Sequence, residues 1–342
     1  MKSIIMAGGL GTRLRPITDN IPKSLIPVAG KPVVFYLMEA LARVSNDYIL
    51  TVSYRYDKVI DLFSGQAAKG KNILFSVEKE PLGTAGGLKK VEKFIENTFI
   101  VGNADTIFQQ DVRSLVNFHK KNKNTVTLGL TPVDDPSEFG VARVRNGRVL
   151  EFQEKPKVNP ISNLANVGVY VMEPEIFDYI EKGKQVDVAK ELLPALQSSG
   201  KRIGGFRMKG TWIDIGRPRD LIKANVFVAG KSTKKVNGSK LLGKIYLGKN
   251  VKIGKNCILE DVAIYDGVEI EDNVRIKNSV VYDDSTVGSG SKIEDSILSF
   301  GSVLGEGVII SDSVIGGGLL LRKGGKIEGT VVSLGEDKPG DY

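Results

Sequence analysis

The stretch Ser3-Ile4-Ile5-Met6-Ala7-Gly8-Gly9-Leu10-Gly11-Thr12-Arg13 joins a short apolar run to a glycine-rich loop. The run has the length of a buried strand, and the three glycines let a ligand approach the backbone closely. Backbone N–H groups of such a loop can surround phosphate oxygens, to which the threonine adds a hydroxyl and the arginine a cation. The pattern is neither a dinucleotide fingerprint nor a P-loop. Taken alone it predicts a phosphate-binding loop or a plain tight turn.

Outward from this stretch, apolar runs alternate with helical patterns as far as about Val228. Such alternation needs crossover connections and predicts a mixed, mainly parallel sheet with helices on both faces. Ligands of such sheets gather at the carboxyl ends of the strands. Two junctions therefore matter most: the end of the first run at Gly8, and the run Phe99 to Val101, which leads into Gly102-Asn103-Ala104-Asp105.

The chain changes character after residue 230. Residues 231–239 form a polar linker, and residues 240–342 repeat every six positions. Three six-residue sides make one turn of a solenoid, with small aliphatic side chains inside and Gly, Asn or Asp at the corners. We therefore expect a catalytic domain over residues 1–230 and a parallel β-helix over residues 240–342. The repeat shows itself in two ladders, Ile258, Ile264, Ile270, Ile276 and Val262, Val268, Val274, Val280, with the phase shifting later.

Composition restricts the class of protein. No apolar run approaches the ~20 residues that cross a bilayer, and the single cysteine, Cys257, excludes an intramolecular disulfide. Both features favour a cytoplasmic protein that does not bind membranes. The net charge of +8 is spread among 40 acidic residues, so anionic small molecules are better expected partners than nucleic acid.

A long series of motifs follows the glycine loop. The segment from Gly8 to Pro32 resembles the signature of the nucleoside-diphosphate-sugar pyrophosphorylases, also called sugar-1-phosphate nucleotidyltransferases, some of which carry a C-terminal β-helix. The resemblance continues through five further motifs, Glu80-Pro81-Leu82-Gly83-Thr84-Ala85-Gly86, Glu154-Lys155-Pro156, Asn166-Val167-Gly168-Val169-Tyr170, Trp212-Ile213-Asp214-Ile215-Gly216 and the hexapeptide tail. It implies a Rossmann-like nucleotidyltransferase fold and a left-handed β-helix.

The resemblance also implies the chemistry. A sugar phosphate oxygen attacks the α-phosphorus of a nucleoside triphosphate in line and releases pyrophosphate, so charge neutralisation and positioning supply the catalysis. The matching positions are Arg13 and Lys23 for catalysis; Gly8, Gly9, Gly11, Thr12, Glu78 and Gly83 for the nucleotide; Gly140, Glu154, Lys155 and Asn166 for the sugar phosphate; and Asp105 and Asp214 for Mg²⁺.

Two positions need separate comment. Ala104 stands where most members of the family have glycine before the metal-binding aspartate, which predicts a local change of backbone or of sugar approach. His119 is the only histidine, lies in Phe118-His119-Lys120-Lys121, and is expected to be a solvated residue at a helix end.

Glu78 bears on the choice of base. Relatives that use thymidylyl or uridylyl groups often have glutamine here, which can both donate and accept, whereas a carboxylate only accepts. Guanine presents two adjacent donors, N1–H and its exocyclic amino group, so mannose 1-phosphate with GTP is the first expectation. Glucose 1-phosphate with dTTP or UTP is the alternative, because Glu78 could instead point to solvent.

Two rival functions and an assembly remain open. An acetyltransferase activity in the β-helix would normally need a histidine base, and residues 241–342 contain none. A non-catalytic regulatory homologue would not need Arg13, Lys23, Asp105 and Asp214.

The β-helix should leave apolar side chains outside the coil, in the run Leu319-Leu320-Leu321 and in the segments Val280-Val281-Tyr282 and Val308-Ile309-Ile310. We therefore expect a homo-oligomer through residues 240–342, and an active fragment when the chain ends at Lys231.

Overall fold

The computed structural model describes residues 1–231 and 235–333, so part of the expected linker and the last nine residues lie outside the described chain. Two compact units make up the structure. The first contains Met1–Leu10 and Val33–Trp212, and the second joins Gly11–Pro32 to the chain from Ile213 onward. The glycine-rich loop is thus divided between the units. Among the described residues, no helix combines the length and apolar character that crossing a membrane requires.

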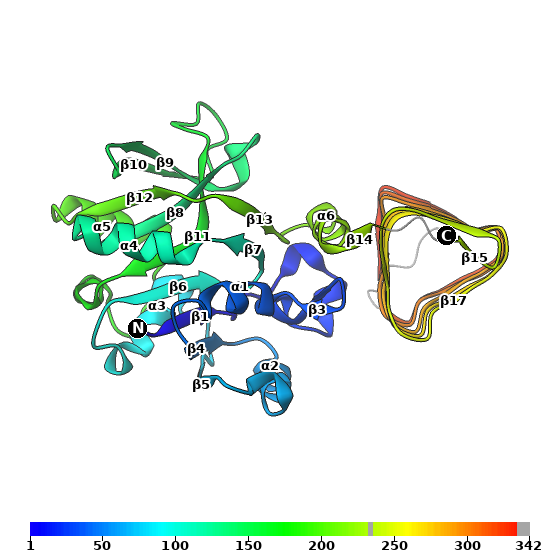
Figure 1. The fold of residues 1–342 in the computed structure, drawn as a ribbon, viewed down its shortest axis with the longest axis horizontal. Helices are drawn as coiled ribbons and strands as arrows, with labels where there is room; N and C mark the ends of the chain where they lie inside the picture. Colours follow the sequence, from blue (N-terminus) through cyan, green and yellow to red (C-terminus); the bar gives the residue numbers. More distant parts are fainter. Residues whose placement is uncertain (232–234, 334–342) are drawn as a thin grey trace. The chain divides into compact units, whose positions relative to one another are not determined.

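A nine-stranded sheet forms the centre of the first unit (Figure 1). Its strand order is β5-β4-β1-β6-β11-β8-β12-β10-β9. The strands are β1 (Ser3–Met6), β4 (Asp47–Val52), β5 (Asn72–Val77), β6 (Phe99–Asn103), β8 (Val126–Pro132), β9 (Gly140–Arg145), β10 (Arg148–Glu154), β11 (Leu164–Met172) and β12 (Ile203–Arg207), with β7 (Thr106–Gln110) and β13 (Gly210–Asp214) outside this sheet. The helices are α1 (Val34–Leu41), α2 (Tyr56–Phe63), α3 (Gly83–Lys90), α4 (Val112–Asn122) and α5 (Leu193–Ser198).

The parallel pairing predicted from the sequence holds for β5, β4, β1 and β6. The chain leaves β1 toward β4 and β5 and then returns to pair β6 on the other side of β1. This reversal creates a switch point, where open α/β sheets bind ligands. Beyond β6 the pairing becomes antiparallel with β11, and β11 carries a register shift between Asn166 and Tyr170.

Alternating side chains of the parallel strands pack against helices on the two faces of the sheet. Ile4, Ile49 and Val101 share a buried cluster with Leu88 of α3 and Leu196 of α5. On the opposite face, a Cβ added to Gly102 would lie 2.8 Å from Leu37 of α1. Helices therefore cover both faces, as the sequence predicted.

The expectation for His119 was wrong. Its side chain on α4 is 1% exposed, with Nδ1 2.9 Å from the Thr127 hydroxyl and Nε2 2.9 Å from Oε1 of Glu173. Burial lowers the pKa of His119, while the Glu173 carboxylate opposes that change. The sequence showed the lysines that follow His119 but not the strand residues that enclose it.

The second unit contains three parts, described by their elements. Residues 11–32 form three short 3-10 turns, Thr12–Leu14, Ile17–Asp19 and Lys23–Leu25, and the hairpin of β2 (Pro27–Val28) and β3 (Lys31–Pro32). Helix α6 spans Pro218–Val228. The remaining strands are β14 (Gly230–Lys231), β15 (Lys235–Val236), β16 (Ser239–Leu247), β17 (Lys252–Ile253), β18 (Ile258–Ile264), β19 (Glu269–Ile270), β20 (Arg275–Val281), β21 (Thr286–Val287), β22 (Lys292–Glu294), β23 (Ile297–Leu298), β24 (Val303–Leu304), β25 (Ile309–Ser311), β26 (Val314–Ile315), β27 (Leu320–Leu321), β28 (Lys326–Glu328) and β29 (Val331–Val332).

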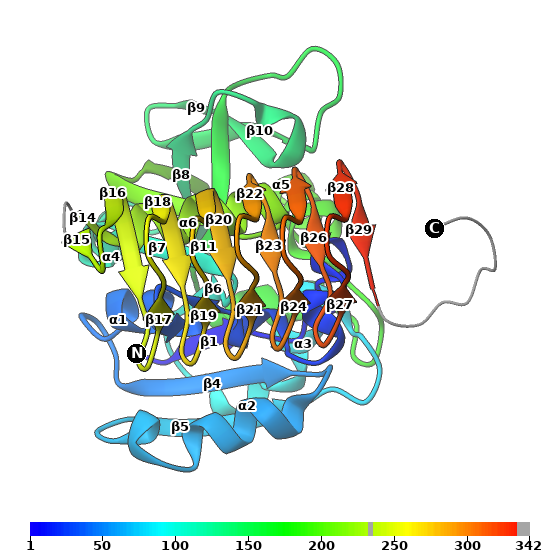
Figure 2. The ribbon, with the colours of Figure 1, turned by 90° about the vertical axis from the view of Figure 1, so that its right-hand side faces the viewer.

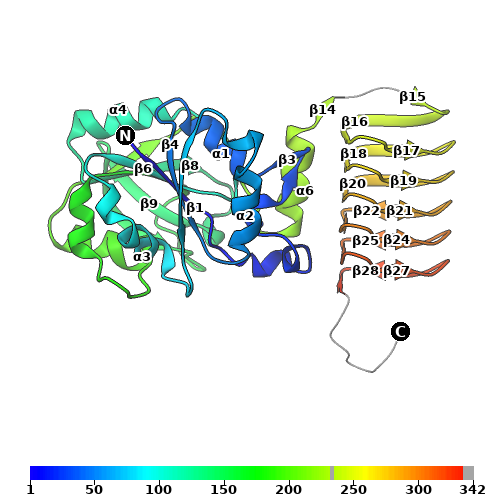
Figure 3. The ribbon, with the colours of Figure 1, turned by 90° about the horizontal axis from the view of Figure 1, so that it is seen from below.

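The β-helix is triangular in cross-section and its coils stack in parallel (Figures 1, 2 and 3). Its coil is 17 residues long, because Glu269 pairs with Thr286 and Thr286 with Val303. Inward side chains succeed one another at steps of six, five, six, six and five along Ile253, Leu259, Ile264, Ile270, Ile276 and Val281. The short side turns at residues with positive φ, Asp261, Asn278, Asp295 and Asp312, as Asn and Asp tolerate.

The shortened side explains the phase shift in the sequence repeat and corrects one predicted ladder. Ile276 stacks on Leu259, whereas Ile258 pairs with Arg275 and is only half-buried. A strict period of six places Ile258 in the core; the actual period moves it out.

Outward apolar side chains are covered in some coils and exposed in others. Val281 faces the core of the coil, and Val280 and Tyr282 are completely buried as well, contrary to the expectation that this segment presents apolar side chains to another subunit. Helix α6 packs beside β18 and β20 (Figure 3), and the Tyr282 hydroxyl reaches the Pro27 carbonyl of β2. In the last coils, Ile309 and Leu320 are 39% and 67% exposed.

Candidate active site

The first unit places Gly8, Gly9 and Asp105 at one edge of its sheet. Met6, which precedes the glycines, is in register with Asn103, and the backbone N–H of Ala104 donates to the Met6 carbonyl at 3.1 Å. A Cβ at Gly9 would meet no atom within 4 Å, so this part of the loop is open. The predicted phosphate-binding backbone and the first predicted metal ligand therefore lie at the switch point of the sheet.

Ala104 is part of the protein core. Its side chain is 1% exposed directly after β6, while the neighbouring Asp105 remains half-buried. Gly168 of β11, with φ of 71°, packs so close to Asn103 that an added Cβ would lie 2.3 Å from the amide nitrogen. The methyl group of Ala104 thus points into packed protein.

Glu78 follows β5 and is 8% exposed, so it does not point to solvent. Its Oε2 accepts a hydrogen bond of 3.3 Å from the Leu82 backbone N–H, and its Oε1 lies over α3, 2.6 Å from where a Gly87 Cβ would stand. Burial raises the pKa of Glu78, and the Leu82 N–H and the charge of Lys90 partly offset that rise. This carboxylate shapes the loop before α3 and presents acceptor oxygens there.

Contacts within the protein itself require glycine at position 83. Its φ is 72°, and an added Cβ would lie 2.5 Å from the carbonyl oxygen of Val186. The same carbonyl accepts hydrogen bonds from Ala85 and Gly86, and Thr84 Oγ1 donates to Asp187. A contact with a base is therefore not needed to explain this glycine.

Three of the predicted sugar-phosphate residues lie together at the end of the β9–β10 pair. Gly140 is in register with Glu154, and an added Cβ would lie 2.6 Å from the Glu154 Oε2. Lys155 has a φ of 47°, donates its N–H to the Phe139 carbonyl, and holds its Nζ 3.8 Å from Glu154. Burial raises the pKa of Glu154, and Lys155 lowers it by a smaller amount.

Asn166 lies at the register shift of β11. Its amide Nδ2 donates to the Tyr170 hydroxyl at 2.6 Å, and its Oδ1 accepts from the Gly168 backbone N–H at 3.1 Å. Burial raises the pKa of Tyr170, with smaller contributions from Asp187 and Glu154. Tyr170 and Asp187 therefore belong to the surroundings of the predicted sugar residues, although the sequence analysis did not single them out. Tyr170 is the last residue of the motif that begins at Asn166, so the sequence contained a signal for it.

The second unit holds the other predicted residues, beginning with Gly11, Thr12 and Arg13. Gly11 has a φ of 65°, and an added Cβ would clash with Thr18 at 2.9 Å and approach Lys23 at 3.1 Å. Thr18 fixes this turn by donating its hydroxyl to the Gly11 carbonyl at 2.9 Å. Thr12 and Arg13 begin the next 3-10 turn and are both exposed.

Lys23 and Asp214 form an ion pair inside the second unit. Nζ of Lys23 lies 3.5 Å from Oδ1 of Asp214, and the two side chains are 11% and 29% exposed. A Cβ at Gly216 would lie 3.1 Å from both the Arg13 Nη2 and the Asp214 Oδ1. The structure thus groups two cations and a carboxylate from sequence segments 190 residues apart.

The donor atoms suit a hard divalent cation that shares its ligands with phosphates. The described part of the chain contains no group of three or more His, Cys, Asp or Glu side chains arranged to hold a metal ion. Magnesium typically takes one or two protein carboxylates and fills its octahedron with waters and phosphate oxygens. Asp105 in the first unit and Asp214 in the second each carry a carboxylate of that kind.

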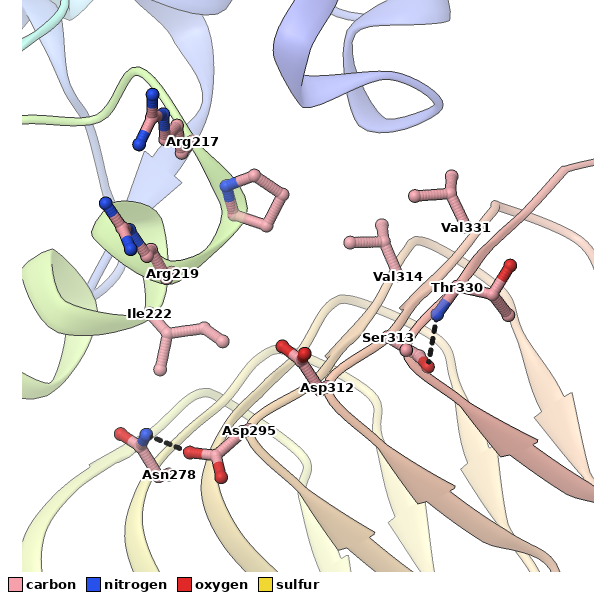
Figure 4. Close-up of a pocket in the computed structure, with 12 residues that line it drawn as sticks. Arg217, Arg219, Ile222, Asn278, Asp295, Asp312, Ser313, Val314, Thr330 and Val331 are labelled. Carbon is pink, nitrogen blue, oxygen red and sulfur yellow. Dashed lines mark hydrogen bonds between the residues drawn. The ribbon is translucent and has the colours of Figure 1, made fainter. Parts of the chain in front are cut away.

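A separate pocket of about 480 Å³ lies between the first turn of α6 and the tight corners of the later coils (Figure 4). Pro218 and Ile222 of α6 and the preceding Arg217 line it on one side, and Asp295 and Asp312 line it from the β-helix. The Asn278 amide donates to the Asp295 carboxylate. The predicted catalytic, nucleotide and sugar residues do not line this pocket.

Comparison with family models decides the class. The nucleotidyl transferase model matches residues 2–231, and the GMPPB C-terminal domain model matches residues 222–334. The chain belongs to the nucleotidyl transferase family. It is a nucleotidyltransferase enzyme, and members of this family generally use a divalent metal ion.

Individual relatives agree with the family. The mannose-1-phosphate guanyltransferase of Aspergillus oryzae is 35% identical over 275 residues, covering 75% of this chain and 74% of the relative. That of Saccharomyces cerevisiae is 36% identical over 265 residues, covering 74% and 73%. Among solved structures, a putative glucose-1-phosphate thymidylyltransferase from Bacillus anthracis aligns with a TM-score of 0.62 and 29% identity, covering 69% of this chain and 98% of that one. HddC from Yersinia pseudotuberculosis, complexed with GMP-PN, aligns with a TM-score of 0.57 and 30% identity, covering 66% and 97%.

Proposed function

We propose that this enzyme joins mannose 1-phosphate to GTP, giving GDP-mannose and pyrophosphate, in the cytoplasm. The observation that carries the proposal is the similarity to curated mannose-1-phosphate guanyltransferases, at 35% identity over 75% of the chain for the Aspergillus oryzae protein. The match to the GMPPB C-terminal domain over residues 222–334 supports it.

The proposed mechanism relies on charge neutralisation. Arg13 grips triphosphate oxygens with its planar guanidinium while the backbone of Gly8, Gly9 and Gly11 surrounds others, and the Thr12 hydroxyl adds a donor. The ammonium group of Lys23 binds both the triphosphate and the incoming sugar phosphate. The ion pair of Lys23 with Asp214 keeps that ammonium in place before substrate arrives.

Magnesium is the proposed metal, with Asp105 and Asp214 as its protein ligands. When bound, Mg²⁺ neutralises charge on the triphosphate and on the departing pyrophosphate. The carboxylate of Asp214 also fixes Lys23, so this one side chain serves two partners.

Glu78 supports guanine as the base. It is a buried carboxylate at the loop before α3 rather than a solvated one. Ionised, it offers acceptors only, which suits the adjacent N1–H and amino donors of guanine better than the single N3–H of thymine and uracil, which lies between two carbonyl acceptors. Its hydrogen bond with Leu82 leaves further lone pairs for a base.

Sugar phosphate recognition is assigned to the other residues of the first unit. Glu154 accepts from sugar hydroxyls beside Gly140, Lys155 binds the phosphate, and Asn166 lines the sugar. The close approach of Gly140 to Glu154 and the partly buried hydrogen bond of Asn166 with Tyr170 support these roles.

A second candidate is glucose 1-phosphate with dTTP or UTP. It is favoured by the structural similarity to the putative glucose-1-phosphate thymidylyltransferase from Bacillus anthracis, with a TM-score of 0.62.

The test is a matrix of the four common triphosphates plus dTTP against mannose, glucose and N-acetylglucosamine 1-phosphates, read by pyrophosphate release and by mass of the product. Highest kcat/KM for GTP with mannose 1-phosphate is expected. Preference for dTTP with glucose 1-phosphate would establish the second candidate, and no turnover with any pair would contradict both candidates.

A further inference from the structure

Four aromatic rings stack along the outside of the β-helix, one from each of four successive coils. The ring centroids are 5.2 Å apart for Tyr246 and Tyr265, 4.7 Å for Tyr265 and Tyr282, and 4.8 Å for Tyr282 and Phe300. Aromatic side chains on the outer face of a solenoid are normally solvated or covered by a partner. Here Tyr265 is 2% exposed and Tyr282 is 0% exposed.

Two of these phenols reach the signature segment of the same unit. The Tyr265 hydroxyl lies 2.8 Å from the Pro27 carbonyl and 2.6 Å from Oδ1 of Asn225, and the Tyr282 hydroxyl lies 3.1 Å from the Pro27 carbonyl. A phenol has one hydrogen to donate. Tyr282 can therefore serve Pro27 while Tyr265 serves Asn225, so both acceptors are satisfied. Burial raises the pKa of Tyr282, so its hydroxyl keeps its proton.

Pro27 is four residues after Lys23 and is joined to it by tight backbone turns. The N–H of Leu25 donates to the Pro22 carbonyl at 2.9 Å, and the N–H of Ile26 donates to the Lys23 carbonyl at 3.2 Å. Holding the Pro27 carbonyl therefore restrains the backbone that carries Lys23.

Asn225 provides the second restraint. It is fully buried on α6, and its Oδ1 also accepts from the Ala29 backbone N–H at 2.9 Å. Helix α6 begins at Pro218, four residues after Asp214. The same tyrosine pair is thus tied to the segment bearing Lys23 and to the helix that follows Asp214.

We propose that Tyr265 and Tyr282 of the β-helix are positioning residues of the nucleotidyl transfer, holding Lys23 against Asp214 through Pro27 and Asn225. The β-helix then acts as part of the catalytic apparatus, although neither tyrosine touches substrate. This inference rests on the proposed role of Lys23 in phosphoryl chemistry, not on the identity of the sugar or base.

The first test is a kinetic double-mutant cycle on the full-length enzyme with its best substrate pair. Tyr265→Phe/Tyr282→Phe keeps both rings and should lower kcat roughly 10- to 100-fold, as displaced catalytic groups do, with KM for the triphosphate changed less than about threefold. In a Lys23→Ala background the same pair should lower kcat by less than about threefold, because the tyrosines act through Lys23. Equal losses in both backgrounds would overturn the proposal.

Two matched controls separate positioning from stability. Tyr48→Phe removes another buried phenol, which donates to the Met38 carbonyl at 3.3 Å in the first unit. Tyr246→Phe alters the same ring stack at a hydroxyl that has no hydrogen bond among the described residues. Both should retain kcat within about twofold. A loss of kcat in either control as large as in the double variant would reduce the effect to general destabilisation.

A second measurement needs no turnover. Hydrogen exchange of the peptide covering residues 22–32 should be at least several-fold faster in Tyr265→Phe/Tyr282→Phe than in the parent or in Tyr48→Phe. Unchanged exchange would overturn the inference even if the enzyme uses other substrates than proposed. Faster exchange in a protein inactive with every substrate pair would support the restraint while removing the proposed function.

Discussion

The two units of this enzyme carry different parts of the candidate site. The first unit, built on the nine-stranded sheet, holds Glu78, Glu154 and Asn166, which are proposed to recognise base and sugar. The second unit holds Arg13, Lys23 and Asp214 together on segments attached to a β-helix. The proposed base and sugar recognition thus lies in the first unit, whereas the proposed groups for charge neutralisation are shared, with Asp105 and Lys155 in the first unit and Arg13, Lys23 and Asp214 in the second.

This difference indicates how the β-helix contributes to the candidate active site. A solenoid stabilises itself by stacking its coils. The earlier coils also bury Tyr265 and Tyr282 against the segment that carries Lys23. Substitutions at Arg13, Lys23 or Asp214 should therefore mainly change kcat, and substitutions at Glu78 should mainly change which substrate is preferred.

The largest effect is expected from the proposed metal ligands. Asp105→Asn and Asp214→Asn should each lower kcat by at least ~100-fold, the scale of losing a key electrostatic stabiliser. Asp214→Asn also weakens the ion pair with Lys23, so its loss should be the greater. Steady-state kinetics over a range of Mg²⁺ concentrations checks this, and near-normal rates for both variants would remove the metal assignment.

Removal of the β-helix should have the next largest effect. A chain ending at Lys231 lacks Tyr265 and Tyr282, and we now expect its kcat to fall roughly 100-fold, instead of the retained activity that the sequence suggested. A chain ending at Gly318 keeps the aromatic stack and is the matched control, with kcat expected within about threefold. A folded fragment ending at Lys231 with near-parental kcat would contradict the structural interpretation.

A smaller effect is expected at Glu78. Glu78→Gln should reduce the preference for GTP over dTTP or UTP by roughly tenfold in relative kcat/KM, the scale of one or two altered hydrogen bonds. Competition between triphosphates in one reaction measures the ratio directly. An unchanged ratio would show that backbone groups read the base.

The same variant also gives a pH prediction. Burial raises the folded-state pKa of Glu78 above its ordinary value, so the folded chain keeps this proton to higher pH than the unfolded chain does. Stability is then lost as pH rises from about 4.5 through the raised pKa. Glu78→Gln should melt at a higher temperature than the parent at pH 7 to 8, and this gain should shrink toward pH 4. A gain that does not vary with pH would contradict this cause.

The smallest catalytic effect is expected in the last coils. Leu320 is 67% exposed, and it supports the proposal of a homo-oligomer formed through the β-helix. Leu320→Asp should reduce the oligomer size seen by light scattering while kcat changes less than about twofold. Leu150→Asp, at a leucine 45% exposed in the first unit, is the control. A monomeric parent would remove the assembly proposal.

Several properties followed from the sequence alone because they depend on local pattern. Alternating apolar runs predicted the α/β sheet, repeated aliphatic positions predicted the β-helix, and ordered motifs predicted the nucleotidyl transferase family. The shift in repeat phase was also visible. Its cause, a side shortened at Asp261 and its equivalents with positive φ, appeared only in the structure.

Other properties depended on contacts between residues far apart in the chain. His119 looks exposed beside its lysines, but Thr127 and Glu173 enclose it. Val280 and Tyr282 look available to another subunit, but both are fully buried where α6 packs on β20 and where the Tyr282 hydroxyl meets Pro27 of the same unit. Sequence periodicity indicates which side chains must be buried, whereas the tertiary structure determines which residues cover them. For the same reason, the connection from Tyr265 through Pro27 to Lys23 could be found only in the tertiary structure.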